Sequence, residues 1–138
     1  MRTTLDHVSI FAIVTATIAV MALGALWFTM LFERPYAVVL GRGSQPKAKM
    51  EPLYFVGPSL CALVTTVASA ILMSAQRIGS IGEAAGFGTI VGVGYLSATA
   101  MNMAINPNIP RPILYGLLSS AYFLVSSILI SVIIYAIH

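Results

Sequence analysis

The chain has 138 residues, of which 59% are hydrophobic and only 8% are charged, and its mean hydropathy is +0.95. A soluble domain carries about 25% charged residues, so these values exclude an ordinary soluble protein and indicate a single membrane domain over residues 1–138. The net charge of +3 comes from scattered basic residues beside apolar segments, which argues against a nucleic-acid partner.

Long segments without Asp, Glu, Lys or Arg predict membrane-spanning helices at about 8–32, 53–76, 84–106 and 113–137. A helix needs about 20 residues to cross the hydrocarbon. The segments do not alternate between apolar and polar residues, as the strands of a β-barrel do. The sequence therefore predicts an all-α integral membrane protein, a four-helix bundle built from two hairpins with both termini on the same side.

The first segment is interpreted as a retained helix, with a cleaved signal peptide as the alternative. Asp6 interrupts the basic N-terminal region, and the apolar run is longer than the about 7–15 residues of a signal peptide. The helix is predicted to stop at the sequence Glu33-Arg34-Pro35, because Arg34 precedes a proline and so avoids the helical region. Residues 33–52 then form the only long connection that we expect.

An aromatic cluster closes the first segment in the sequence GALWFTMLFERPY at 24–36. Trp and Tyr favour the headgroup level of a membrane, where the ring lies in the apolar zone and its polar edge meets water. We therefore expect an interfacial anchor, with an aromatic ligand pocket as the alternative. The anchor residues, which gather at one predicted membrane face, are Trp27, Tyr36, Tyr54 and Tyr115.

The third segment carries small residues at a spacing of four. Small residues at this spacing lie on one side of a helix and let another backbone approach closely. The pattern predicts that the third helix lies at the centre of the bundle or at a seam between copies. Its members are Ala84, Gly88 and Gly92, followed by Gly94, Ala98 and Asn102.

The fourth segment repeats this theme with hydroxyl groups. Gly116, Ser120, Ser127 and Ser131 share one face of the predicted helix. Hydroxyls on such a face can bond across helices or to their own turn, at an average of about 0.6 kcal/mol each. We interpret the face as a packing surface, and the alternative is a polar path for a solute.

Polar side chains gather near the end of the third segment, where Thr99, Asn102 and Asn106 lie. An Asn side chain in lipid needs a hydrogen-bond partner. The simplest partner is a Ser or Thr of a neighbouring helix. The alternative is one wall of a small solute site, with Arg111 above it.

The order of these motifs resembles the domain-of-unknown-function 1761 family of small, mostly bacterial four-helix membrane proteins. Gly24, Ala25, Leu26 and Trp27 match the step near the end of the first helix in that family, with Phe28 in place of the usual Tyr. The later polar landmarks are Asn102, Arg111, Pro112 and Tyr122, with Ala121 where Gly is common. The resemblance implies a fold and a bacterial inner membrane, and it implies no activity.

Basic residues predict the orientation. The first and third connections carry five of them and the opposite side carries two. This difference favours a cytoplasmic location for those two connections, with the termini outside. The residues are Arg34, Arg42, Lys47, Lys49 and Arg111 on one side, and Arg2 and Arg77 on the other.

Catalytic patterns are absent from the sequence. No ionisable carboxylate or base lies inside a predicted span, where such a group would usually mark function, and His7 and His138 lie at the two chain ends. We therefore expect no enzyme activity, metal site or cofactor, and we expect a structural or accessory subunit that assembles with itself or with a larger membrane complex. The alternative is a small oligomeric channel or transporter for a neutral or anionic solute. A lipid-modifying enzyme is disfavoured, because the sequence offers no catalytic acid, no base and no metal site for it.

Overall fold

A computed structural model of the protein describes residues 8–46, 49 and 51–137. Every element in this part of the chain is a helix, which confirms the predicted class. The four helices that are long and apolar enough to cross a membrane are Ile10–Leu31, Leu53–Gln76, Ile81–Ala104 and Pro112–Ile137. Predictions that involve Arg2, His7, Lys47 and His138 lie outside the described residues.

Two of the four spans change from α- to π-helix along their length. The first span consists of α2 (Ile10–Leu26) and the π-helix η1 (Trp27–Leu31), and the short helix α3 (Glu33–Val39) follows it. The second span is α4 (Leu53–Gln76). The third consists of α5 (Ile81–Val91), the π-helix η2 (Gly92–Ser97) and α6 (Ala98–Ala104). The fourth is α7 (Pro112–Ile137).

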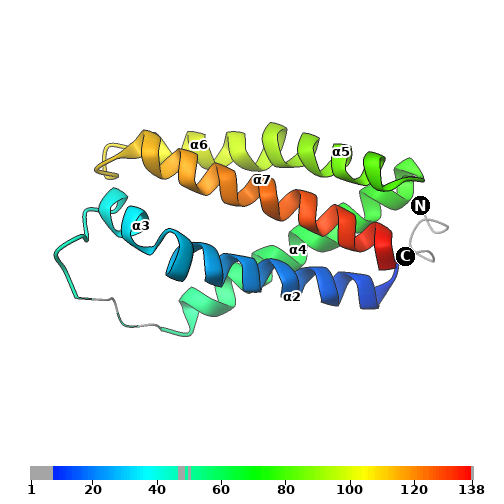
Figure 1. The fold of residues 1–138 in the computed structure, drawn as a ribbon, viewed down its shortest axis with the longest axis horizontal. Helices are drawn as coiled ribbons and strands as arrows, with labels where there is room; N and C mark the ends of the chain where they lie inside the picture. The colour runs from blue at the N-terminus through cyan, green and yellow to red at the C-terminus, as the bar shows by residue number, and fades with distance from the viewer. Residues whose placement is uncertain (1–7, 47–48, 50, 138) are drawn as a thin grey trace.

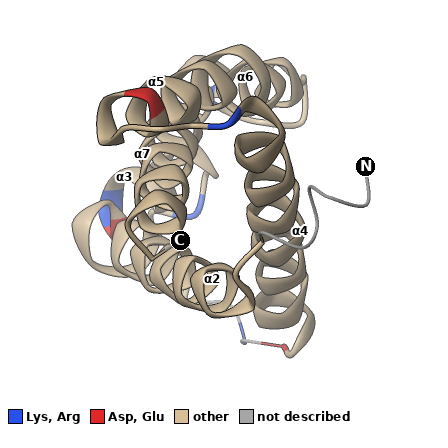
Figure 2. Cartoon of the chain, turned by 90° about the vertical axis from the view of Figure 1, so that its right-hand side faces the viewer, with Lys and Arg blue, Asp and Glu red and all other residues tan. Residues whose placement is uncertain are grey.

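The fourth span is the central element of the bundle. Helix α7 lies between α2 on one side and α5 and α6 on the other, and α4 packs chiefly against α2 (Figures 1 and 2). The prediction of a central third helix is therefore wrong within the chain. The reason is that α7 buries small side chains, such as Ser119 and Ser127, so that helices can approach it from more than one direction. A seam between copies stays a prediction for the third span.

The apolar core occupies the half of the bundle near the turn between α4 and α5. Its buried members are Ile13, Ala16, Val20, Ala70, Met73, Ala84, Phe87, Ile130 and Ile134. Helix α2 begins and α7 ends at this same end of the bundle (Figure 1). The other half, where the connections to α4 and α7 lie, is packed differently and carries the candidate site.

A capping arrangement sets the start of the third span. The Ser80 hydroxyl accepts a hydrogen bond from the Glu83 N–H at 3.1 Å, and the Glu83 carboxylate accepts one from the Gly79 N–H at 2.7 Å. These bonds satisfy backbone donors that a helix start leaves free. The helix consequently begins at Ile81, a turn earlier than the predicted range 84–106.

Candidate functional site

The first span changes its helix type where the GALWF sequence ends. The Phe32 N–H donates to the Trp27 carbonyl oxygen at 2.9 Å, five residues back, and Trp27–Leu31 forms a π-helix. A single π-turn adds one residue to a helical turn and is frequent at functional sites. The added residue changes the direction in which the following aromatic side chains project.

Helix α3 then occupies the start of the connection that we expected to be a loop. Its first turn contains Pro35. The first N–H groups of a helix have no partner within the helix, so a proline removes no hydrogen bond there. The first span ends at Leu31, but the prediction that Arg34 avoids the helical region is wrong, because Glu33–Val39 forms a second, separate helix.

Aromatic side chains hold η1 and α3 against α7. The Phe28 ring centroid lies 4.8 Å from that of Tyr36 and 5.1 Å from that of Tyr122. The Tyr36 and Tyr115 rings are stacked with centroids 6.3 Å apart. Aromatic pairs at such distances stabilise a fold by about 0.5–1.5 kcal/mol beyond the area they bury. The aromatic cluster thus replaces the aliphatic core at this end of the bundle.

Gly24 makes the close approach of Tyr122 possible. A Cβ atom at Gly24 would lie 2.9 Å from the Tyr122 hydroxyl oxygen and 3.4 Å from its Cζ. The Tyr122 hydroxyl also points to the Val20 carbonyl oxygen at 3.4 Å. The GALWF sequence therefore combines a glycine that receives the Tyr122 ring with aromatic residues that pack around it.

The Tyr36 phenol stays neutral at physiological pH. Burial raises its pKa above the ordinary value of 10.0, the nearby Tyr115 adds to this rise, and Arg42 partly opposes it. Because the neutral phenol carries no charge, Tyr36 adds no negative charge at this end of the bundle.

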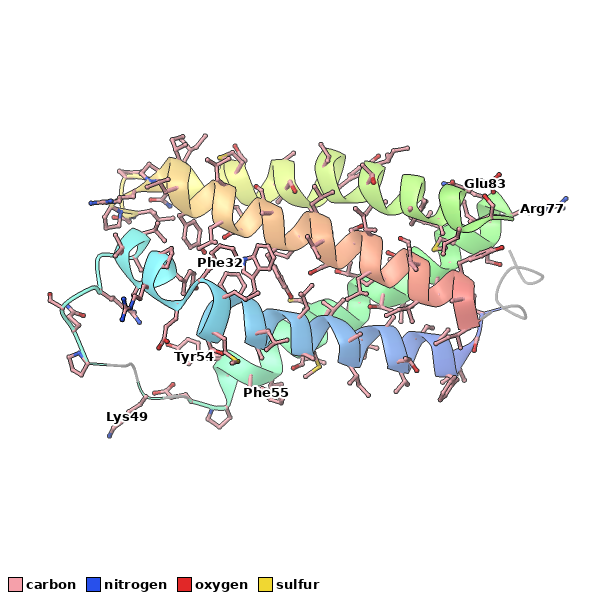
Figure 3. The ribbon with its side chains drawn as sticks, viewed as in Figure 1. Phe32, Lys49, Tyr54, Phe55, Arg77 and Glu83 are labelled. Carbon is pink, nitrogen blue, oxygen red and sulfur yellow. The ribbon has the colours of Figure 1, made fainter. Side chains whose placement is uncertain are left out.

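An open groove with a volume of about 680 Å³ lies between α3 and the first half of α7. Its charged lining residues are Arg34 and Arg111, and the others are apolar. The apolar residues are Trp27, Phe32, Pro35, Val38 and Val39 from the first span and α3, and Leu114, Leu117, Leu118 and Ala121 from α7. Figure 3 shows Phe32 in the half of the bundle that carries α3, far from Arg77 and Glu83.

The two arginines of the groove are free to bind a ligand. Both side chains are exposed, and neither guanidinium forms an ion pair or a hydrogen bond with another described residue. A guanidinium offers several donors in a planar fork that fits phosphate and carboxylate groups. The groove is therefore an apolar cleft whose charged lining residues are the two arginines.

Trp27 does not lie as an interfacial anchor would. Its indole nitrogen is buried and has no hydrogen-bond partner among the described residues, whereas an anchor keeps this N–H in water. Phe32 and Tyr122 pack on the Trp27 ring, with centroids 4.7 and 6.2 Å away. Tyr54, in contrast, is 60% exposed. Of the other predicted anchors, Tyr36 and Tyr115 are half-buried in the aromatic cluster.

The model of one family, described as a protein of unknown function (DUF1761), matches residues 11–135. The match covers nearly the whole chain, with all of the second and third spans and nearly all of the first and fourth. The chain belongs to the DUF1761 family. No curated protein and no solved structure matches it.

Several residues that carry the DUF1761 resemblance converge on the groove and the aromatic cluster. Gly24 contacts Tyr122, Trp27 lies beside Tyr122, and Trp27 and Arg111 both line the groove. These residues come from the first and fourth spans, which are distant in the sequence. Their convergence singles out this end of the bundle as the candidate functional site of this DUF1761 protein.

The polar residues of the third span do not join this site. Thr99, Asn102 and Asn106 are exposed and do not line the groove. The Asn106 side-chain oxygen accepts the Asn108 N–H at 2.9 Å within its own turn. The alternative of a solute wall with Arg111 above these residues is therefore not assembled within the chain, because Arg111 lines the groove together with Arg34 and these three residues do not.

Sequence reasoning missed Arg34 as a partner of Arg111. A signal was present, because each arginine is followed by a proline at the membrane end of a span. The role of α3, which brings Arg34 to the groove, could not be read from this signal.

The predicted packing residues of the third span divide into two groups. Ala84, Gly88 and Gly92 are buried. A Cβ at Gly88 would lie 2.7 Å from the Ile128 Cα, and one at Gly92 would lie 3.1 Å from the Leu124 Cα. Gly94 and Ala98 are exposed. The first group packs backbone to backbone on α7, and the second faces away from it.

The π-helix η2 explains how the seam continues beyond Gly92. Five residues further on, the Ser97 hydroxyl donates to the Ser120 carbonyl oxygen at 2.9 Å, and the Ser120 hydroxyl donates to the Ser97 carbonyl oxygen at 3.1 Å. A Cβ at Gly116 would contact the Met101 sulfur and lie 3.2 Å from the Ala104 Cβ. The contact face thus runs through Ser97, because one π-turn shifts it by a residue.

The remaining hydroxyls of the predicted face on α7 are buried. Ser131 donates to the Ser127 carbonyl oxygen, one turn back, at 2.8 Å. Ser127 is itself buried against Gly88 and Gly92. These side chains fill the seam between α5 and α7.

Proposed function

We propose that this DUF1761 protein is a structural or accessory subunit without catalytic activity, which assembles through the uncovered face of its third span. The observation that carries the proposal is the exposure of Gly94, Ala98 and Asn102 at a spacing of four. A Cβ at Gly94 would meet no heavy atom of the described chain within 4 Å, its own helix backbone apart. Small residues of this kind let a second helix approach closely in lipid.

The polar groups on this face favour the same interpretation. Neither Thr99 nor Asn102 forms a hydrogen bond with another described residue. An amide without a partner is costly in an apolar environment. A helix from another copy, or from a larger membrane complex, would supply the partner. The hydroxyls of Ser120 and Ser131 already bond to carbonyl oxygens, which favours packing over a solute path along α7.

The assembly is tested by cross-linking in native membranes. Cys61 is the only cysteine and is exposed, so the variants are made in a Cys61→Ser background. Ala98→Cys should give a disulfide-linked product on mild oxidation. Val64→Cys on α4, which is 67% exposed, is the matched control at an apolar surface and should stay monomeric.

The mass of the product decides between the two forms of the proposal. A product of twice the chain mass supports self-assembly, and a defined heavier product at position 98 alone supports a larger complex. Monomer at both positions, together with a monomeric mass in lipid nanodiscs, would contradict the assembly.

We further propose that the protein lies in a bacterial inner membrane with the first and third connections in the cytoplasm and both termini outside. The excess of basic residues in those connections supports this orientation. Gln45→Cys and Gly82→Cys, in the same Cys61→Ser background, should react with an impermeant maleimide from opposite sides. Reaction of the cysteine at position 45 from outside intact cells would reverse the orientation.

A further inference from the structure

We propose that the groove between α3 and α7 binds one anionic phospholipid, with the headgroup phosphate at Arg34 and Arg111 and an acyl chain along the apolar wall. This site is independent of the assembly proposed above, since the assembly face lies on η2 and α6. The two proposals can therefore fail separately.

The volume and walls of the groove suit an acyl chain. Its volume of about 680 Å³ lies within the about 300–1,000 Å³ that is common for small-molecule sites. Apart from the two arginines, every lining residue is apolar. A soluble anion would gain nothing from walls such as Leu117 and Leu118, whereas a hydrocarbon chain gains favourable contacts along their whole length.

The position of the groove along the bundle matches one leaflet. Arg34 follows the end of the first span, and Arg111 precedes the start of the fourth, so both guanidinium groups belong to the headgroup level. From Arg111, just before α7, to Ala121 within it, the chain covers about 15 Å at a rise of about 1.5 Å per residue. This length is half of the about 30 Å hydrocarbon thickness, which is the depth that one lipid chain occupies.

The charge of the groove selects an anionic headgroup. None of the described residues that line it is acidic, and the two guanidinium groups have no partner among the described residues. Arginine binds phosphate through paired, charge-assisted hydrogen bonds. Basic pockets between membrane helices bind anionic lipid headgroups by the same physics. A zwitterionic lipid would bring its own cation beside the two arginines and bind more weakly.

The chain contains its own reporter for this site. Trp27 is the only tryptophan, and it lines the groove. Brominated acyl chains quench tryptophan fluorescence on contact, so an occupied groove gives quenching of Trp27. The purified full chain in a neutral detergent is titrated with brominated phosphatidylglycerol and, in parallel, with brominated phosphatidylcholine.

We expect phosphatidylglycerol to quench at about a tenfold lower mole fraction than phosphatidylcholine, since each basic group near a headgroup adds appreciable attraction. The double variant Arg34→Gln, Arg111→Gln should lower this preference to about one. The matched control is Arg77→Gln, which removes the same charge at the opposite end of the bundle (Figure 3) and should keep the preference. Circular dichroism checks that each variant is folded.

A wall variant and a soluble competitor separate the sources of the signal. Ala121→Phe adds a large side chain to the groove wall, at the lining position of α7 that is furthest along the chain from Arg111, and should reduce quenching by both lipids. Glycerol phosphate should not displace brominated phosphatidylglycerol, and displacement by it would assign the site to a soluble phosphate and overturn the lipid proposal. Equal quenching by the two lipids in the wild type would also overturn it. A third outcome is that neither lipid quenches Trp27 and that the Leu117→Cys variant forms cross-links between two chains. This outcome would assign the groove to a second copy of the chain instead.

Discussion

Glycine occurs on both faces of the third span, and its surroundings on the two faces are opposite. A Cβ at Gly88 would lie 2.7 Å from the Ile128 Cα and 2.8 Å from the Ser127 carbonyl oxygen. A Cβ at Gly86 or Gly94 would meet no heavy atom of the described chain within 4 Å, apart from the backbone of its own helix. One face is therefore closed by α7 at backbone distance, and the other is open to whatever surrounds the chain. The same residue type serves tight packing in one place and leaves a free surface in the other.

The largest loss of stability is expected from Gly88→Ala. Real Cβ atoms do not approach backbone atoms as closely as this one would, so α5 and α7 must separate. Overpacking of this kind costs about 1–3 kcal/mol, and we expect the upper part of that range. The measurement is the free energy of unfolding in one fixed detergent mixture, titrated with a denaturing detergent.

Gly86→Ala is the matched control for this variant. It lies two residues away on the open face, and alanine is the better helix former by up to about 1 kcal/mol. Its free energy of unfolding should stay the same or rise slightly. Equal losses for the two variants would show that the seam does not depend on contact at Gly88.

A smaller loss is expected for Gly92→Ala. The nearest atom to its Cβ is the Leu124 Cδ1 at 3.0 Å, which can move, while the Leu124 Cα at 3.1 Å must shift by a few tenths of an ångström. We expect a loss of about 1 kcal/mol in the same unfolding titration. A loss larger than that of Gly88→Ala would place the tightest contact one turn further along the span.

Hydrogen bonds at the seam are expected to contribute less than glycine packing. Ser97→Ala and Ser120→Ala each remove one bond to the carbonyl oxygen of the other residue. Each should cost about 0.6 kcal/mol, the average for such bonds in membranes. Thr89→Ala is the control, because its hydroxyl bonds to the Ala85 carbonyl oxygen of its own helix. If Ser97→Ala behaves like Thr89→Ala, the bonds across the seam contribute nothing measurable.

The spans could be predicted because lipid leaves the sequence few choices. A charge-free run of this length must satisfy its backbone groups internally, and a helix does so. The start of the third span at Ile81 was also readable, since Ser80 and Glu83 have the spacing of a capping box. The predicted start at 84 is the first residue of the charge-free run that follows Glu83.

The face of the third span toward α7 could not be predicted beyond Gly92. A spacing of four places 96 and 100 next on that face, whereas the structure places Ser97 and Met101 there. The π-helix Gly92–Ser97 adds the extra residue. A four-residue pattern does not indicate where such a residue is added. In the same way, the π-helix Trp27–Leu31 and the helix Glu33–Val39 bring Arg34 to the groove, which the sequence did not indicate. The groove thus depends on local helix geometry, and the spans depend on composition.

The smallest change in the free energy of unfolding is expected from Gly94→Leu, which tests the open face of the third span against the closed face at Gly88. The added side chain projects into open space, so the free energy of unfolding of the monomer should change by less than about 0.5 kcal/mol. If copies assemble through this face, the same side chain separates them, and the cross-linking yield of Ala98→Cys should fall severalfold in the Gly94→Leu background. A loss of monomer stability like that of Gly88→Ala would mean that the face is covered within the chain. Unchanged cross-linking would mean that assembly uses another surface. Stable monomers with reduced cross-linking would show that the open face serves contact between chains, while the closed face holds each chain together.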